Sequence, residues 1–186
     1  DQVGALSERD LVLAVISGGG SALLTSPAPG LSLADLQRTT ELLLRSGATI
    51  VELNTLRKHL SAIKGGELAR RAAPARIISL VLSDVVGDPL DVIASGPTVP
   101  DPTTFEDAWS VLKRYDLVGR VPPPVRTRIR SGVEGALPES PKPADPLFLT
   151  VRNLVVGSNR LAAEAAVEEA RAQGWSALLL STYVEG

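Results

Sequence analysis

The sequence predicts an α/β fold of three layers, with helices on both faces of a mostly parallel sheet. Short apolar runs rich in Val, Ile and Leu are predicted to be strands at residues 11–16, 77–82, 153–156 and 177–181. These runs are apolar throughout and do not alternate with polar residues, which is typical of strands buried on both faces. Helical patterns separate the runs, so we expect right-handed crossovers between consecutive strands.

The first two helical segments have clear end signals. Ser32 and Asp35 form a capping-box pattern, and Gly47 is expected to end the helix that follows. A second helical stretch runs from about residue 49 to residue 71. It is expected to break near the two glycines at 65–66, since glycine disfavours a helix interior.

The later helices show the same kinds of signal. Thr104 and Asp107 repeat the capping pattern, and Ser158 is expected to cap an alanine-rich helix that ends at Gly174. The three prolines at 122–124 are expected to start a short helix, because proline is favoured in the first turn.

The chain is predicted to form a single domain over residues 1–186, a length that can bury a sizeable core. Half of the 14 prolines lie within residues 122–147, and residues 131–147 are expected to be a surface excursion. The sequence contains no methionine, even at position 1. We therefore expect it to be an internal piece of a longer protein.

Composition excludes several classes of function. The formal net charge is -2, the sequence pI is near 5.5 and no basic block occurs, which argues against a nucleic-acid partner. Cysteine is absent, which excludes disulfides and thiolate metal sites, and the single histidine, His59, is expected to be a hydrogen-bonded structural residue. No apolar run approaches the roughly 18 residues of a membrane span and no signal peptide is apparent, so we expect a cytoplasmic location.

A glycine-rich segment directly follows the first predicted strand. It consists of Ser17, Gly18, Gly19, Gly20 and Ser21. If a helix follows, unobstructed backbone N–H groups converge at the positive end of its dipole, and the serines add hydroxyl donors. The segment is therefore predicted to bind a phosphate or carboxylate. The alternative is a tight strand-to-helix turn with no ligand.

Two aspartates follow the second predicted strand. Asp84 and Asp88 are four residues apart in a turn at the edge where open α/β sheets bind ligands. Such a pair suits Mg²⁺, which is held by one or two carboxylates together with substrate phosphates. Alternatively, both aspartates only cap turns. Ser158 and Asn159, at the start of a helix after a strand, form a second and less specific anion motif.

A basic group lies in the second helical stretch. Helical spacing places Arg57, Ser61 and Lys64 on one face and Asn54 with Lys58 on a neighbouring face. Such a group can meet phosphate oxygens, or it can be a solvated basic surface.

Other phosphate and nucleophile motifs are absent. The glycine segment lacks the Gly-Lys-Ser/Thr ending of a Walker A loop. Leu23 stands where both the dinucleotide fingerprint and a nucleophile elbow at Ser21 would need glycine.

Taken together, five segments resemble the class II glycerate kinases. They are residues 16–22 (ISGGGSA), 54–66 (NTLRKHLSAIKGG), 83–88 (SDVVGD), 93–98 (IASGPT) and 156–159 (VGSN). Members of this family are ATP-dependent glycerate 2-kinases, and some have been labelled hydroxypyruvate reductases. The resemblance covers nearly the whole chain.

The resemblance implies a protein about twice as long, in which an N-terminal Rossmann-like domain faces a smaller C-terminal α/β domain across a cleft. The present chain would be the central and later part of the first domain. It would lack an N-terminal segment with a catalytic lysine and the whole C-terminal domain, so we expect it to be inactive alone. The implied reaction transfers the γ-phosphoryl group of ATP to the 2-hydroxyl of D-glycerate with Mg²⁺, as part of carbohydrate metabolism.

The resemblance also suggests roles for individual residues. Lys58 and Asp84 would be catalytic, and Asp84 and Asp88 would hold Mg²⁺. Substrate carboxylate or phosphate groups would meet Ser17, Gly18, Gly19, Gly20, Ser21, Asn54, Arg57, Lys64, Ser158 and Asn159. A hydroxypyruvate reductase and a non-catalytic folded fragment stay open as alternatives, as does a homo-oligomer.

Overall fold

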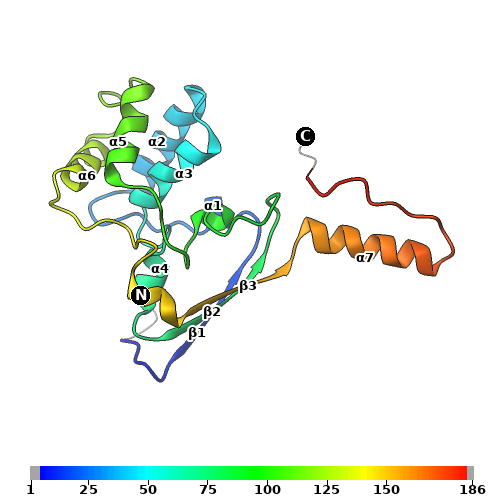
Figure 1. Ribbon diagram of the computed structural model, residues 1–186. Helices are drawn as coiled ribbons and strands as arrows, with labels where there is room; N and C mark the ends of the chain where they lie inside the picture. Colours follow the sequence, from blue (N-terminus) through cyan, green and yellow to red (C-terminus); the bar gives the residue numbers. More distant parts are fainter. Residues whose placement is uncertain (1–4, 184–186) are drawn as a thin grey trace.

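The computed structural model describes residues 5–183, and its centre is a parallel sheet (Figure 1). The strands are β1 (Leu11–Ile16), β2 (Arg76–Leu82) and β3 (Val151–Gly157), in the order β1-β2-β3. Leu11 pairs with Arg76, and Ile77 pairs with Val151. The α/β class with a parallel sheet and the first three predicted strands are therefore confirmed.

The helical elements among the described residues have the following bounds: α1 (Gly20–Leu23), α2 (Leu33–Arg45), α3 (Ile50–His59), α4 (Glu67–Ala72), α5 (Phe105–Arg114), α6 (Pro123–Val133) and α7 (Asn159–Ala172), with 3-10 helices η1 (Ile93–Ser95) and η2 (Pro146–Thr150). The second helical stretch breaks between α3 and α4, as expected, although α3 already ends at His59. In the part of the chain that the structure describes, no helix combines the length and apolar character needed to cross a bilayer.

The predicted capping boxes of α2 and α5 are present, and α3 has a third one. In α3, Glu52 accepts hydrogen bonds from the N–H and hydroxyl of Thr49. The same carboxylate accepts from Arg114 at 2.5 Å and from Tyr115 at 2.8 Å, at the end of α5. The backbone hydrogen bond from Thr49, with these side-chain donors, lowers the pKa of Glu52 to about 2. One carboxylate therefore caps α3 and ties it to α5.

A helical lobe formed by α2, α3, α5 and α6 holds the largest core (Figure 1). Leu56 of α3 and Leu112 of α5 are almost fully buried in it. Val125 and Ile129 of α6 are also fully buried, and the prolines at 122–124 start this helix as predicted. The lobe thus packs through the apolar stripes that the helical periodicity indicates.

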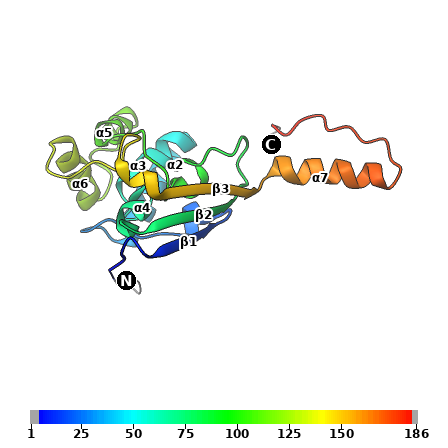
Figure 2. The ribbon, with the colours of Figure 1, turned by 60° about the horizontal axis from the view of Figure 1, so that its bottom comes forward.

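The strands are buried on one face only, which corrects the expectation that both faces are covered. In β1 the inward residues Val12, Ala14 and Ile16 pack against the helices, while Leu13 and Val15 are 58% and 76% exposed. Figure 2 shows the helices of the lobe on one side of the sheet and no described helix on the other. The third layer is therefore not formed by residues 5–183. Apolar residues alone do not distinguish one covered face from two.

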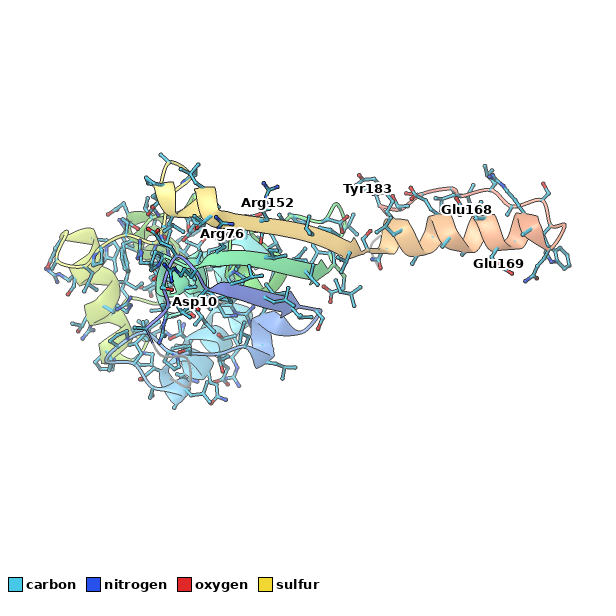
Figure 3. The ribbon with its side chains drawn as sticks, turned by 90° about the horizontal axis from the view of Figure 1, so that it is seen from below. Asp10, Arg76, Arg152, Glu168, Glu169 and Tyr183 are labelled. Carbon is cyan, nitrogen blue, oxygen red and sulfur yellow. The ribbon has the colours of Figure 1, made fainter. Side chains whose placement is uncertain are left out.

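The predicted strand at 177–181 is wrong. Residues 175–180 have no regular secondary structure, and Leu178 and Leu180 are 78% and 87% exposed. A strand requires a neighbouring backbone to complete its hydrogen bonds, and no other segment of residues 5–183 lies beside this one. It follows α7, which projects from the end of β3 away from the lobe (Figures 1 and 2). In Figure 3, Glu168, Glu169 and Tyr183 accordingly lie far from Asp10, Arg76 and Arg152 at the opposite end of the sheet.

The proline-rich segment is only partly a surface excursion. Ser140 and Pro141 are buried, contrary to expectation. The Ser140 hydroxyl donates to Asp101 Oδ2 at 2.8 Å, and the Asp101 N–H donates to Pro141 O at 2.8 Å. One hydrogen bond to the fully buried carboxylate of Asp101 and one from its backbone N–H hold this part of the segment against the body.

We expect Gly132→Ala to destabilise the helical lobe by about 2 kcal/mol, because a Cβ at this position would overlap the buried ring of Phe105. Gly119→Ala is the matched control, since nothing lies within 4 Å of its added Cβ. Urea unfolding followed by tryptophan fluorescence measures both changes. Equal stability of the two variants would show that the α5–α6 contact is looser than described.

Candidate active site at the carboxyl edge of the sheet

The three parallel strands end at the same edge of the sheet. β1 leads into residues 17–20, which we call the glycine loop; β2 leads into Asp84; and β3 leads into Ser158. Ligands of open α/β sheets bind beyond the carboxyl ends of the strands. The structure therefore brings the glycine loop, the carboxylate turn and the second anion motif to the edge where a ligand is expected.

Two glycines of the loop are required by close approach of other segments. A Cβ at Gly18 would overlap the carboxyl group of Asp84, whose Cγ would lie 2.9 Å away. A Cβ at Gly20 would lie 2.8 Å from the Cβ of Ala94. Gly19, with φ of 82°, adopts the left-handed conformation that favours glycine. The loop is thus shaped for contact with a carboxylate on one side and a second loop on the other.

The two predicted metal ligands belong to one turn but have different neighbours. Asp84 lies against the glycine loop, whereas Asp88 lines a small cavity of about 130 Å³ with Asn159 and Arg160. Within residues 5–183, no cluster of three or more His, Cys, Asp or Glu side chains could hold a metal alone. Mg²⁺ needs only one or two carboxylates when phosphate oxygens and water complete its shell. Asp84 fits a metal shared with a phosphate at the glycine loop.

Lys64 joins the glycine loop to η1 from the side of the helices. Its Nζ donates to Ser21 O at 3.0 Å and to Ala94 O at 3.4 Å, and the residue is only 3% exposed. Burial, and secondly the nearby charge of Arg57, lower its pKa to about 8. The ammonium group is therefore desolvated, and no described carboxylate forms an ion pair with it.

A cavity of about 450 Å³ opens between α2 and α3 beside the glycine loop. Ser21, Arg57 and Lys64 contribute its polar groups near the loop. The rest of its wall combines leucines with five further polar residues: Leu33, Leu36, Leu43, Leu44, Leu56 and Leu60, and Thr25, Gln37, Thr39, Thr40 and Glu41. The size lies within the usual range of ligand pockets, which are apolar with a few placed polar groups.

Glu41, the carboxylate in the cavity lining, does not neutralise Arg57 or Lys64. Glu41 lines the cavity, but its carboxylate pairs with Arg38 at 2.8 Å and Arg45 at 2.7 Å. Within the described residues, Arg57 has no ion pair with a carboxylate, and burial lowers its pKa. Arg57 and Lys64 together therefore attract an anion from outside the protein.

A relay of three polar side chains lies beside this cavity. Ser95 Oγ donates to Asn54 Oδ1 at 3.1 Å, and Ser21 Oγ lies 3.3 Å from Ser95 Oγ. Asn54 is 4% exposed and Ser95 is fully buried. The relay connects α3, η1 and α1 and reaches the cavity at Ser21.

The loop at η1 has an unusual backbone. Ala94, Ser95 and Gly96 have consecutive φ values of 51°, 61° and 63°. A residue other than glycine in this conformation costs on the order of 1 kcal/mol or more. Gly65 N donates to Ser95 O at 2.9 Å and Gly66 N donates to Gly96 O at 2.8 Å, which holds the loop in place. Such strain is commonly found at functional sites.

Lys58, a predicted catalytic residue, forms a buried ion pair in the structure. It is 4% exposed, and its Nζ lies 3.4 Å from Asp101 and 3.8 Å from Asp91. The ammonium group balances a buried carboxylate and is not part of the cavity lining, and its catalytic role stays a prediction. His59 is a hydrogen-bonded structural residue as predicted, because its Nδ1 donates to Thr55 O at 2.8 Å.

The structure thus brings Ser21, Asn54, Arg57 and Lys64 together, while Ser158 and Asn159 lie at the carboxyl end of β3. The sequence assigns no role to Ser95, which the structure places between Ser21 and Asn54. The one sequence feature that could have drawn attention to Ser95 is the pair of small residues Ala94 and Ser95 before Gly96 and Pro97. Its left-handed backbone, and so the direction of Ser95, follows only from contacts with residues 65–66.

The fold and site together define a parallel α/β protein with a glycine loop and an aspartate turn at the carboxyl edge of its sheet. More particularly, the chain belongs to the family described as Domain of unknown function (DUF4147), whose family model matches residues 1–130.

Named relatives match the chain over most of its length. "Glycerate 2-kinase" of Pyrococcus horikoshii is 49% identical over 96% of this chain. A protein of Agrobacterium vitis with a provisional hydroxypyruvate reductase name is 45% identical over 99% of the chain. The crystal structure of glycerate kinase from Thermotoga maritima superposes with a TM-score of 0.82 at 43% identity, over 94% of the chain. The present chain spans only 40%, 40% and 39%, respectively, of these proteins.

Neutral substitution of the adjacent residues Arg57 and Lys58 should change the free energy of unfolding by different amounts. Lys58→Met leaves Asp101 buried without its cation and should reduce the free energy of unfolding by about 3 kcal/mol. Arg57→Met, the matched comparison, removes a cation that has no carboxylate partner among residues 5–183 and should change stability by less than about 1 kcal/mol. Denaturant unfolding gives both values, and similar losses would contradict the distinction.

Proposed function

We propose that the protein carrying this chain phosphorylates D-glycerate at its 2-hydroxyl, with ATP as donor and Mg²⁺ as cofactor. The observation that carries the proposal is the pair Arg57 and Lys64 at a cavity beside the glycine loop. Burial desolvates both cations, and neither has a carboxylate partner among residues 5–183. The names of the relatives supply the substrate. A role in carbohydrate metabolism and a cytoplasmic location stay predictions.

The substrate carboxylate is assigned to Arg57 and Lys64. A guanidinium binds a carboxylate through two parallel N–H donors, and the Lys64 ammonium has a third proton beyond the two that it donates to backbone carbonyls. Low exposure strengthens both contacts, since water screens them less. This placement puts the hydroxyl groups of D-glycerate next to Ser21 in the same cavity.

The transferred phosphoryl group is assigned to the glycine loop. Asp84, which lies against Gly18, would hold Mg²⁺ there. Asp88, in the same turn, would contact the ion directly or through a water molecule. When bound, the ion neutralises charge on the phosphate oxygens. The backbone N–H groups of the loop orient the phosphate, and Lys64 fixes the loop relative to the acceptor.

Phosphoryl transfer depends mainly on positioning and electrostatic stabilisation, which agrees with a site built from a loop, cations and a carboxylate. The chain spans about two fifths of its relatives, so the catalytic lysine and the closing domain are proposed to come from other parts of a longer protein. Residues 5–183 would form one wall of the cleft.

The assay that tests the proposal compares two reactions in the full-length protein. ADP formation from ATP and D-glycerate is expected, whereas hydroxypyruvate should not accelerate oxidation of NADH. The second outcome follows from Leu23 at the position where a dinucleotide loop needs glycine. NADH oxidation without ADP formation would favour the reductase reading.

We expect Gly18→Ala to raise the Mg²⁺ concentration needed for half-maximal activity by about 10-fold, because the new Cβ must displace the Asp84 carboxyl group. Asp84→Asn should show the same direction of change, and Gly119→Ala should show none. A magnesium titration of the initial rate measures the effect. An unchanged requirement in the first two variants would limit Asp84 to turn formation.

The kcat/KM for D-glycerate should fall as pH rises through about 8. Lys64, whose pKa is about 8, is charged and binds the substrate carboxylate below this pH, and it loses its charge above it. Lys64→Met should have a lower kcat/KM that no longer falls near pH 8. A pH profile of both proteins is the measurement, and an identical alkaline limb in Lys64→Met would contradict the assignment.

A further inference from the structure

We propose that Ser21 offers the cavity an acceptor oxygen and not an O–H donor, and that this oxygen accepts a hydrogen bond from the 3-hydroxyl of D-glycerate. The inference rests on the proposed function and specifies how one wall of the site recognises its substrate. Asn54 and Ser95 act as positioning residues, since they set the direction of the hydrogen bond that Ser21 makes.

The direction is set at the buried end of the relay. Asn54 Oδ1 is a carbonyl oxygen, which only accepts hydrogen bonds. Ser95 Oγ, at 3.1 Å, must therefore donate its single proton to Asn54. Asn54 and Ser95 are 4% and 0% exposed, so both groups must satisfy their hydrogen bonds within the protein.

The next step of the relay follows from the first. Ser21 Oγ lies 3.3 Å from Ser95 Oγ, and either hydroxyl could be the donor if the pair were isolated. Since the proton of Ser95 is already donated to Asn54, Ser21 donates to Ser95. A serine hydroxyl has one proton and two lone pairs. Ser21 is left with lone pairs on the side of the cavity.

This direction restricts what Ser21 can bind. An oxygen with only lone pairs available repels phosphate and carboxylate oxygens, which are acceptors themselves. Lys64 does not alter this, because it donates to the carbonyl oxygen of Ser21 and not to its hydroxyl. The proposal therefore differs from the sequence-based expectation that Ser21 adds a hydroxyl donor for an anion, because the group that fits a lone pair is a hydroxyl of the substrate.

The chemistry of the reaction selects which hydroxyl. The 2-hydroxyl that attacks phosphorus must release its proton to a base, and a neutral serine hydroxyl is a poor base. The 3-hydroxyl keeps its proton throughout the reaction and can donate to Ser21 in both substrate and product. With the carboxylate on Arg57 and Lys64, three groups of the cavity then fix the orientation of D-glycerate.

The test compares D-glycerate with D-lactate, which lacks the 3-hydroxyl, as acceptors for the full-length protein. The ratio of their kcat/KM values should fall by about 10-fold in Ser21→Ala, because the variant loses one hydrogen bond to D-glycerate and none to D-lactate. Ser95→Ala should lower the ratio by about 3-fold, although Ser95 does not contact the substrate. Without Ser95 Oγ as acceptor, the Ser21 hydroxyl can rotate away from the orientation that accepts the hydrogen bond. Ser131→Ala, a partly buried serine of α6, should leave the ratio unchanged.

The outcomes separate this inference from the proposed function. Thermal melting confirms that each variant folds, and calorimetric binding of both acids gives the same ratio without turnover. Binding of D-glycerate with the expected changes of ratio, but no ADP formation, would refute the kinase and support the Ser21 contact. An unchanged ratio in Ser21→Ala, or a rise in the KM for ATP instead, would overturn the contact. Failure of the wild-type protein to bind D-glycerate would overturn both.

Discussion

The buried ammonium group of Lys64 holds the candidate site together. It donates to the carbonyl oxygen of Ser21, directly after the glycine loop, and to the carbonyl oxygen of Ala94 in the strained loop at η1. The lysine itself follows α3, so three segments that are distant in the sequence meet at one charge. A buried charge without partners is strongly unfavourable, so the carbonyls must stay in place to solvate it. The shape of the cavity depends on this constraint.

The site combines charges of both signs in separate positions. Arg57 and Lys64 lie at the cavity, whereas Asp84 lies against Gly18 on the strand side of the loop. Cations attract the acidic groups of a ligand, whereas carboxylates suit a metal ion. Their separation by the glycine loop suits a substrate that carries an acid group at one end and receives a metal-bound phosphate at the other. Lys58 is not counted among the cations at the cavity, because Asp101 balances its charge.

Much of the fold follows from local signals in the sequence. The capping boxes at Ser32 and Thr104 act within four residues, so the helices that they begin could be predicted without tertiary information. The first three strands could also be predicted from local sequence, because each is a short run with strong β propensity. The segment at 177–181 is similarly apolar, but it has no β-branched residue and no backbone beside it among residues 5–183, and it is not a strand. Pairing, unlike propensity, is a property of two segments.

The sequence by itself determined the identity of the chemical groups: a glycine loop after a strand, aspartates after the next strand and a cluster of basic residues. Only the tertiary structure decided which of them act together. It paired Lys58 with Asp101 and placed Ser95 between Asn54 and Ser21. It left Arg57 without a carboxylate partner among the described residues. The physical reason is that burial and hydrogen-bond direction depend on neighbours from distant segments, and composition and spacing do not encode these neighbours locally.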